Sequence, residues 1–374
     1  MQTLFLIFKF FMRGGAQRDM VQAIQALQKR KVDTHILCAE ALDPAPEGVE
    51  LTVLPTSGCS NHARAVDFER QALDFIQNHS FDAVIGFNRM GGLDFYFAAD
   101  DCLRCRWQNT WLNNLLNRRR IFLQQEKTAL QTPRIFTLTG RQEQDYQRYY
   151  QIPSDRFTRV PPGIEKKYQH CDHSTAAREQ ARKQYNVSPE DFLIVQAAAS
   201  FKTKGVDRTL AIIDDLPENL KKRVRLIVPG DDKKRSRFQA VADLRNIRAE
   251  FPGGSDRLEE LFTAADLMLH PARAESAGNV LIEALCCNLP VLTTKRCGFA
   301  EYITATGGGV VLPEPFTLQH WSLALQKLMT EPEHLLQCRK NIRNLYKEEF
   351  WYSRAGVIAD EIIKFIRDKQ RGNK

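Results

Sequence analysis

The sequence lacks the short motifs that identify several common classes of protein. It contains no stretch of about 18 apolar residues, so no ordinary membrane-spanning helix is expected. It has no Asp-x-Asp or His-Glu-x-x-His pattern for a catalytic metal ion, and no Gly-x-Gly-x-x-Gly fingerprint for a dinucleotide. These absences argue against a membrane-spanning protein, a metal-dependent centre and a dinucleotide site.

The nine cysteines follow neither a disulfide framework nor a zinc-site pattern. Only Cys102 and Cys105 form a Cys-x-x-Cys pair, and no second pair stands at zinc-finger spacing. Free thiols of a cytoplasmic protein are therefore expected. The apolar start, residues 1–12, is interrupted by Lys9 and precedes no small-x-small cleavage site, which favours a buried first strand over a signal peptide.

The composition is that of a globular protein with room for two domains. Of its 374 residues, 43% are hydrophobic and 26% are charged. Lys and Arg outnumber Asp and Glu by 53 to 45, a surplus of 8. Such a surplus favours an anionic partner, namely a phosphate, a nucleic acid or an acidic membrane. No RNP, KH or helix-turn-helix pattern occurs, so no nucleic-acid partner is expected.

Strand and helix patterns alternate in two successive series, which predicts two doubly wound α/β domains with parallel sheets. Leu4–Phe11 and Ala16–Lys29 open the first series, and Phe192–Ala197 and Val206–Leu216 open the second. Ligands of such sheets bind at the carboxyl ends of the strands. The active site is therefore expected in a central cleft that both domains face.

The domain boundary is expected where Pro161-Pro162-Gly163 interrupts regular structure. Residues 1–163 and 164–350 would form the two domains, and residues 351–374 a helix that packs back toward the first. The polar stretch between Ile164 and about Pro189 is interpreted as the connection between the domains.

One strand, loop and helix carry the most specific pattern. A strand ends at His270, Glu275 lies in the following loop, and a helix that begins near Gly278 carries Glu283. Eight helical residues span roughly 12 Å, about the distance from a ribose across a diphosphate to a hexose. The free N–H groups at the helix start suit the diphosphate, and the two carboxylates suit sugar hydroxyls. The alternative is a pair of surface glutamates.

Three further segments have residue types that suit the transfer of a sugar from a phosphate-containing donor. Lys202 and Lys204 lie on a loop after a strand, where a cation can bind phosphate oxygens, although a solvated basic turn is the alternative. Gly15 opens a helix after the first strand and allows close ligand approach, unless it only forms a tight turn. Asp100 can stabilise charge at an anomeric carbon or position an acceptor hydroxyl, or it can be solvated.

Taken together, the motifs resemble the retaining glycosyltransferases of family 4, and in particular the lipopolysaccharide core glucosyltransferases of Gram-negative bacteria. The resemblance covers nearly the whole chain and rests on Gly14–Asp19, residues 86–100, Pro161–Ile164, Lys204–Arg208, Glu275–Glu283 and Val291–Thr294. It implies the two-domain GT-B fold, with an acceptor-side first domain and a nucleotide-sugar-binding second domain. It also implies transfer of glucose from UDP-glucose to a heptose of the inner core.

The resemblance also implies roles for individual residues. Glu275 would contact the transferred sugar and Glu283 the ribose, with Gly278 at the helix start beside the donor diphosphate. The remaining donor contacts would come from Gly15, Lys166 and Lys204. Thr203 stands where relatives carry arginine, so Lys202 is the candidate for a second cation. Asp100 would act in catalysis, Asp19 would contact the acceptor, and no metal cofactor is expected.

The segment 103–123 is rich in arginine, contains no acidic residue and places apolar side chains at helical spacing. An amphipathic helix of this composition suits the surface of an anionic membrane. The resemblance implies a lipid-anchored acceptor at the cytoplasmic face of the inner membrane, so peripheral association with that face is expected. The alternative is a helix that packs on the core. The expected contacts are Arg104, Arg106, Trp107, Trp111, Arg118, Arg119 and Arg120.

Two other functions remain open. A GT-B transferase that uses another UDP-hexose or a GDP-hexose has the same pattern. A sugar-nucleotide 2-epimerase would share the nucleotide site but would need no acceptor.

Overall fold

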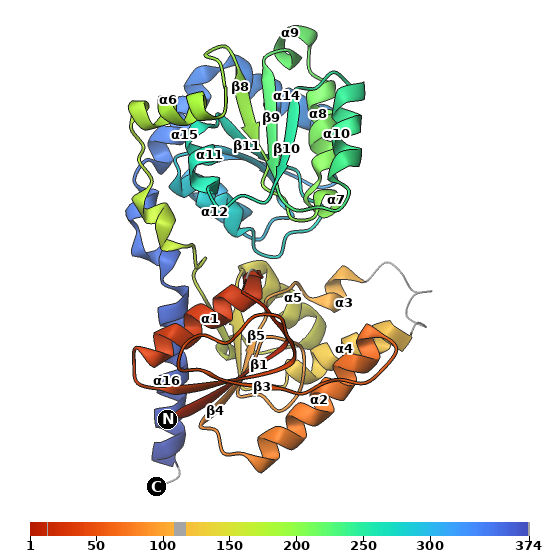
Figure 1. Cartoon of the computed structure of the whole chain (residues 1–374), viewed down its shortest axis with the longest axis vertical. Coiled ribbons are helices and arrows are strands. Elements are labelled where there is room, and N and C mark those ends of the chain that lie inside the picture. The colour runs from red at the N-terminus through yellow and green to blue at the C-terminus, as the bar shows by residue number, and fades with distance from the viewer. Residues whose placement is uncertain (13, 108–116, 373–374) are drawn as a thin grey trace. The chain divides into compact units, whose positions relative to one another are not determined.

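The computed structural model describes residues 1–12, 14–107 and 117–372, which form two compact units. The first unit contains Met1–Gly163 and Ser353–Lys374, and the second contains Ile164–Tyr352. Each unit is a parallel β-sheet with helices on both of its faces (Figure 1). The chain is therefore α/β, with two Rossmann-like doubly wound units.

The sheet of the first unit has the strand order β3-β2-β1-β4-β5-β6-β7. Strand β1 lies inside this sheet between β2 and β4, and its side chains are buried along most of its length. A nearly continuous apolar sequence is typical of such a strand. The strands are β1 Gln2–Phe10, β2 Asp33–Ala41, β3 Glu50–Val53, β4 Ala83–Gly86, β5 Phe95–Phe97, β6 Arg134–Thr137 and β7 Phe157–Arg159.

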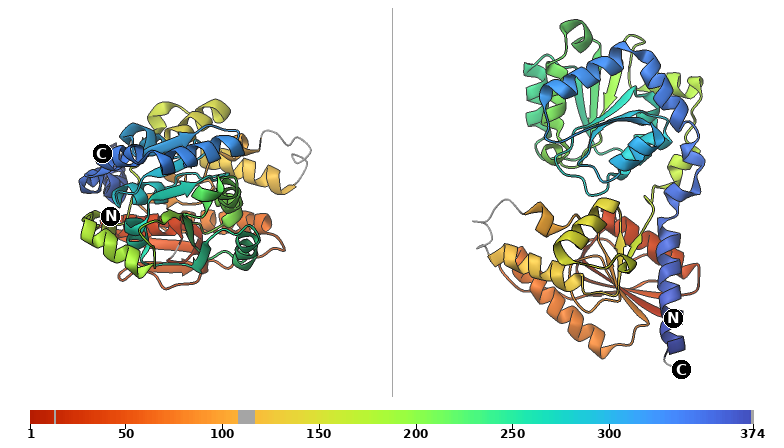
Figure 2. Two further views of the ribbon diagram at one scale, coloured as in Figure 1. Left: turned by 90° about the horizontal axis from the view of Figure 1, so that it is seen from above. Right: turned by 180° about the vertical axis from the view of Figure 1, so that it is seen from behind.

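Helices cover both faces of this sheet, and the last helix of the chain, α16, packs against the first, α1 (Figures 1 and 2). The core of the unit includes Leu4 and Leu6 of β1 together with Phe68 of α2. The helices are α1 Gly15–Gln28, α2 Asn61–Asn78, α3 Leu103–Arg106, α4 Asn117–Ala129, α5 Gly140–Tyr150, the 3-10 helix η2 Ser154–Arg156, and α16 Arg354–Gly372.

The sheet of the second unit has the strand order β10-β9-β8-β11-β12-β13, again with parallel pairing. Its central strands β8 and β11 are fully buried. The order reverses direction between β8 and β11, which is where doubly wound sheets bind ligands. The strands are β8 Phe192–Val195, β9 Val224–Pro229, β10 Ala249–Gly253, β11 Leu267–His270, β12 Val291–Thr294 and β13 Gly309–Leu312.

Short helices predominate around this second sheet, and its core includes Phe201, Leu269 and Trp321. The α-helices are α6 Thr175–Gln184, α7 Phe201–Lys204, α8 Val206–Asp214, α9 Glu218–Lys221, α10 Arg235–Leu244, α11 Leu258–Ala264, α12 Asn279–Cys286, α13 Ala300–Thr306, α14 Leu318–Thr330 and α15 Pro332–Ile342. The 3-10 helices are η3 Lys166–His170, η4 Leu345–Lys347 and η5 Glu349–Tyr352.

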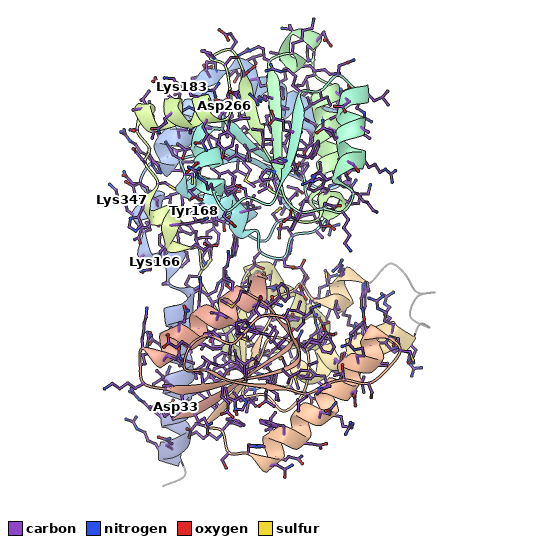
Figure 3. The ribbon with its side chains drawn as sticks, viewed as in Figure 1. Asp33, Lys166, Tyr168, Lys183, Asp266 and Lys347 are labelled. Carbon is purple, nitrogen blue, oxygen red and sulfur yellow. The ribbon has the colours of Figure 1, made fainter. Side chains whose placement is uncertain are left out.

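The interpretation of the stretch after Ile164 as a bare connection is wrong, because it contains η3 and α6 and belongs to the second unit. Helix α6 has few apolar residues and is held by charge instead. Its Arg178 and Arg182 form ion pairs of 2.6 and 3.0 Å with Asp266, which is labelled in Figure 3. Ser174 caps the helix by accepting a hydrogen bond from the Ala177 N–H. A hydrophobic pattern could not reveal a helix anchored in this way.

Candidate active site

The loop between β11 and α12 gives Glu275 a defined position. Gly278 precedes the helix with φ of +98°, a left-handed conformation that glycine adopts without steric cost. The Glu275 carbonyl accepts a hydrogen bond of 3.1 Å from the Gly298 N–H, and Glu275 also forms a β-bridge with Cys297. These contacts fix the loop at Glu275, and α12 begins directly after the loop.

Two basic side chains contact the Glu275 carboxylate. The Lys204 ammonium forms a close ion pair with Oε2, and His270 Nε2 lies 3.3 Å from the same oxygen. His270 is completely buried, and its carbonyl oxygen accepts a hydrogen bond from Thr293. Lys204 keeps 22% of its side chain exposed. Glu275 therefore has one buried basic neighbour and one that remains open to solvent.

The surroundings keep this group of side chains charged over a wide pH range. Burial alone would raise the pKa of the Glu275 carboxyl. The hydrogen bond with His270 and the charge of Lys204 outweigh burial and lower the pKa to about 2. Burial lowers the pKa of the His270 imidazole, but hydrogen bonds with Cys297 and Glu275 outweigh burial and raise the pKa to about 9. Between these two values the pair is an imidazolium and a carboxylate.

A second loop, which carries Lys202 and Lys204, is packed against the first. Gly205 has φ of +78°, and a Cβ there would lie 2.2 Å from the Pro271 carbonyl oxygen, so only glycine permits this approach. The Arg273 N–H donates to the Thr203 carbonyl over 2.8 Å. Because the backbones are joined in this way, Lys204 is held beside Glu275.

Lys202 has a different environment from Lys204. Its side chain is 70% exposed and pairs with Asp207 at 3.0 Å. The Arg273 guanidinium binds the same carboxylate through two hydrogen bonds of 2.7 and 2.8 Å. The structure therefore brings Lys204, Glu275 and the α12 start together and places Lys202 beside Asp207.

Glu283 lies inside α12 and is 7% exposed. Its carboxylate accepts a hydrogen bond of 3.4 Å from the Tyr168 hydroxyl, which reaches it from η3. Lys166, two residues before Tyr168 on the same short helix, pairs at 3.5 Å with the exposed Glu349 (Figure 3). Of the residues of η3, Tyr168 rather than Lys166 contacts Glu283.

In the first unit, Gly15 and Asp100 are both exposed. Gly15 is the first residue of α1, and a Cβ added there would meet no atom within 4 Å. Packing within the described residues thus does not require glycine at this position. Asp100 follows β5 with 71% of its side chain exposed, and its carboxylate lies 3.4 Å from the Arg89 guanidinium.

The expectation that Asp19 contacts the acceptor is not supported by its environment. Its side chain is buried in α1 and forms a 2.7 Å ion pair with Arg354, the first residue of α16. The Arg354 guanidinium also donates to the Pro161 carbonyl over 2.7 Å. A carboxylate held in this way joins two helices of its own unit and has little surface for a substrate.

The amphipathic helix predicted over 103–123 begins at Leu103 as expected but is interrupted after Arg106. Helix α3 ends at Arg106 with Trp107 as its C-cap, and Trp111 lies outside the described residues. Arg119 is 7% exposed and stacks on Trp107, with 5.1 Å between guanidinium and ring centroid. Four of the predicted membrane-contact arginines are exposed: Arg104, Arg106, Arg118 and Arg120.

Sequence reasoning missed the contact roles of His270 and Tyr168. His270 was visible as the last residue of a predicted strand, immediately before Pro271. Its contact with Glu275 depends on how the loop returns over the strand end, and no spacing rule predicts that. Tyr168 approaches Glu283 from a segment that was interpreted as a connection.

Among the described residues, no helix is both long enough and apolar enough to span a membrane. In the same part of the chain, no group of three or more His, Cys, Asp or Glu side chains is arranged to hold a metal ion.

The chain has two doubly wound units and a glutamate and a lysine beside a helix start, an arrangement typical of the GT-B glycosyltransferases. Two family patterns match the chain, Glycosyltransferase Family 4 at residues 13–168 and Glycosyl transferases group 1 at residues 177–345. The lipopolysaccharide glucosyltransferase WaaG of Escherichia coli (strain K12) is 33% identical over 369 residues, which are 97% of this chain and 98% of that protein. The chain belongs to the same glycosyltransferase family as WaaG and is a hexosyltransferase.

Solved structures support the same assignment. The crystal structure of WaaG, described as a glycosyltransferase involved in lipopolysaccharide biosynthesis, superposes with a TM-score of 0.88 over 96% of this chain and 99% of that one. Sucrose-phosphate synthase from Thermosynechococcus elongatus superposes with a TM-score of 0.77 at 17% identity, covering 99% of both chains. That second likeness shows the fold alone.

Proposed function

We propose that the chain transfers glucose from UDP-glucose to a heptose of the lipopolysaccharide inner core, with retention of the anomeric configuration. The observation that carries this proposal is the 33% identity across 97% of the chain to a protein named lipopolysaccharide glucosyltransferase. The arrangement of Lys204, Glu275 and the α12 start supports it, since these are the groups that a nucleotide-sugar donor requires.

Each group at this site has a chemical role in the proposed reaction. The free N–H groups at the start of α12 and the Lys204 ammonium stabilise the charge that develops on the leaving diphosphate. Glu275 accepts hydrogen bonds from the transferred sugar, and buried His270 keeps that carboxylate ionised when Lys204 turns toward phosphate. Glu283 accepts a hydrogen bond from the ribose and Lys202 acts as an outer cation.

The first unit contributes the groups that meet the sugar and its acceptor. At Gly15 the open space above the backbone accommodates the donor, because a side chain there would occupy it. Asp100 is exposed and accepts a hydrogen bond from the acceptor hydroxyl, or stabilises positive charge at the anomeric carbon.

A donor and acceptor screen tests the proposed function. The purified chain is incubated with UDP-glucose, other UDP-hexoses and GDP-hexoses, each with core-truncated lipopolysaccharide, and products are identified by mass spectrometry. Addition of one hexose from UDP-glucose to the heptose is the expected result. UDP release without any change in the acceptor, or conversion of the sugar nucleotide without acceptor, would overturn the proposal.

We expect transfer to be independent of a divalent metal ion. Lys204 and the α12 start supply positive charge where a metal ion would otherwise neutralise the diphosphate. The measurement is the initial rate with and without EDTA, with the same preparation dialysed against chelator as a control. Loss of activity on chelation and its return with Mn²⁺ would show that a metal ion takes part.

We also propose that the exposed arginines at α3 and α4 bind the anionic cytoplasmic face of the inner membrane. We expect the chain to sediment with vesicles that contain phosphatidylglycerol, to bind neutral vesicles weakly and to be released by high salt. Each cation near such a surface contributes about 1 kcal/mol, weakened by salt. Replacing Arg118 and Arg120 with serine should therefore reduce vesicle binding roughly tenfold or more while sparing transfer to a soluble acceptor.

The matched control for this experiment is replacement of Arg235 and Arg237 with serine on α10 of the second unit. This change removes the same charge from a different surface and should leave vesicle binding intact. Arg119 is excluded from the variant because its buried guanidinium packs on Trp107. Equal binding to anionic and neutral vesicles would remove the electrostatic argument.

A further inference from the structure

A pocket opens at the carboxyl ends of three strands in the first unit. Its volume is about 420 Å³, within the usual range for small-molecule sites. Lys9 near the end of β1, Glu40 near the end of β2 and Asn88 just after β4 line one side of it. Residues of α2 and α4 also line it. These two helices pack against each other (Figure 1). The pocket therefore lies at the edge of the sheet where doubly wound units bind ligands.

The lining of this pocket contains both charged groups and aromatic rings. The Glu40 carboxylate forms an ion pair with Arg64 and lies 3.4 Å from the Lys9 ammonium. The Arg64 guanidinium stacks on the ring of Phe8, 5.5 Å from its centroid, and Phe8 meets Phe68 edge to face at 5.6 Å. These ion pairs are only partly buried, so their hydrogen-bonding groups remain accessible from the pocket.

The lining matches the chemistry of a sugar ring. Sugar hydroxyls both donate and accept hydrogen bonds. The pocket supplies donors from Lys9, Arg64 and the Asn88 amide group, whose oxygen accepts from the Phe8 N–H, and acceptors from the Glu40 carboxylate. The apolar C–H face of a pyranose packs against aromatic rings such as Phe8. An apolar ligand would cover the partly exposed ion pairs of Glu40 and take them out of water without offering any hydrogen bond, which is unfavourable.

Arg89 connects the pocket to Asp100. Its side chain lines the pocket, and its guanidinium lies 3.4 Å from the Asp100 carboxylate and 3.3 Å from the buried Glu126. A sugar in the pocket is thus separated by one guanidinium from the carboxylate assigned to the acceptor hydroxyl. The pocket is also a polar site in the first unit that can take the acceptor role expected of Asp19, whose carboxylate is engaged by Arg354.

We propose that this pocket is a subsite for the acceptor saccharide and holds a pyranose residue adjacent to the one that receives the transferred sugar. The inference rests on the proposed function for the identity of that saccharide. It assigns acceptor recognition to Lys9, Glu40 and Arg64 at the strand ends and on α2.

Replacing Ala65 with tryptophan tests this subsite. Ala65 lies on α2, lines the pocket and is partly exposed, so a large side chain there fills the pocket without entering the core. The matched control is Val66→Trp, because Val66 is the next residue of the same helix, is 44% exposed and does not line the pocket. Binding of the heptose-containing oligosaccharide from core-truncated lipopolysaccharide is measured by titration calorimetry, and UDP-glucose binding is measured in parallel.

We expect Ala65→Trp to weaken oligosaccharide binding at least tenfold while Val66→Trp binds like the unaltered chain, with UDP-glucose affinity unchanged in both. If Ala65→Trp does not fold, Asn61→Ala, which removes an exposed amide from the pocket lining, is expected to weaken binding severalfold. Unchanged binding in the folded variant, or no binding by the unaltered chain, overturns the subsite. Binding without glucose transfer overturns the proposed function and leaves the subsite standing.

Discussion

Replacing Glu275 with glutamine is expected to reduce the rate of glucose transfer by at least about a hundredfold. The substitution preserves the shape of the side chain and removes the charge that Lys204 and His270 both contact. A charged contact that is strongest in the transition state contributes about 3 kcal/mol, which is roughly a hundredfold in rate. The measurement is kcat for transfer from UDP-glucose, together with thermal unfolding to verify that the fold persists.

The control for this variant is Glu301→Gln, which removes an exposed carboxylate from α13 of the same unit. It should leave the rate within about twofold of normal, because an exposed charge away from the site contributes little. A folded Glu275→Gln protein with a nearly normal rate would contradict the assignment of Glu275 to the transferred sugar. Loss of UDP-glucose binding without a lower kcat would instead indicate contact in the ground state alone.

Breaking the ion pair between Asp19 and Arg354 is expected to have the largest effect on stability. Both side chains are almost completely buried, at 7% and 2% exposed, and they join α1 to α16. Removing one member of a buried pair leaves the other charge without its partner, which costs about 3–5 kcal/mol. Arg354→Met should therefore lower the free energy of unfolding of the first unit by that amount, as measured by urea denaturation.

Helix α16 and the turn that follows α1 supply the matched control. Arg30 pairs with Asp360, whose side chain is 68% exposed, and Asp360→Ala should cost less than about 1 kcal/mol. The double variant Asp19→Leu with Arg354→Met should recover part of the lost stability, because an apolar pair replaces two buried charges. A cost below 1 kcal/mol for Arg354→Met would mean that the pair is not a structural anchor, and the acceptor role of Asp19 would regain support.

The fold followed from the sequence wherever hydrophobic patterns were strong. Strand β11, Leu267–His270, ends at the predicted residue, and β1 begins and ends within two residues of the predicted Leu4–Phe11. Fully buried parallel strands consist almost entirely of apolar residues, so their pattern survives without any tertiary information. Helix α6 could not be predicted from the sequence, because ion pairs with Asp266 hold it in position and it lacks an apolar stripe.

The candidate site could be predicted in part. Glu275, Gly278 and Lys204 were identified because a strand, a loop and a helix start follow one another locally along the chain, and such local order is encoded in residue type and spacing. The contact of Asp19 with the acceptor was implied by the resemblance rather than by such a local pattern, and the structure shows its side chain in a buried ion pair that the sequence did not indicate. The residue that neutralises it, Arg354, is separated from it by most of the sequence.

The sequence by itself determined the class of fold, the alternation of strands and helices in two successive series, and the charged residues that a sugar nucleotide would need. Only the tertiary structure decided that His270 contacts Glu275, that Arg119 packs on Trp107, and that strand ends and two helices enclose a pocket. The physical reason is the range of the interactions involved. Turn chemistry and hydrophobic periodicity act between neighbours in the chain, whereas burial and ion pairing depend on which distant segments meet.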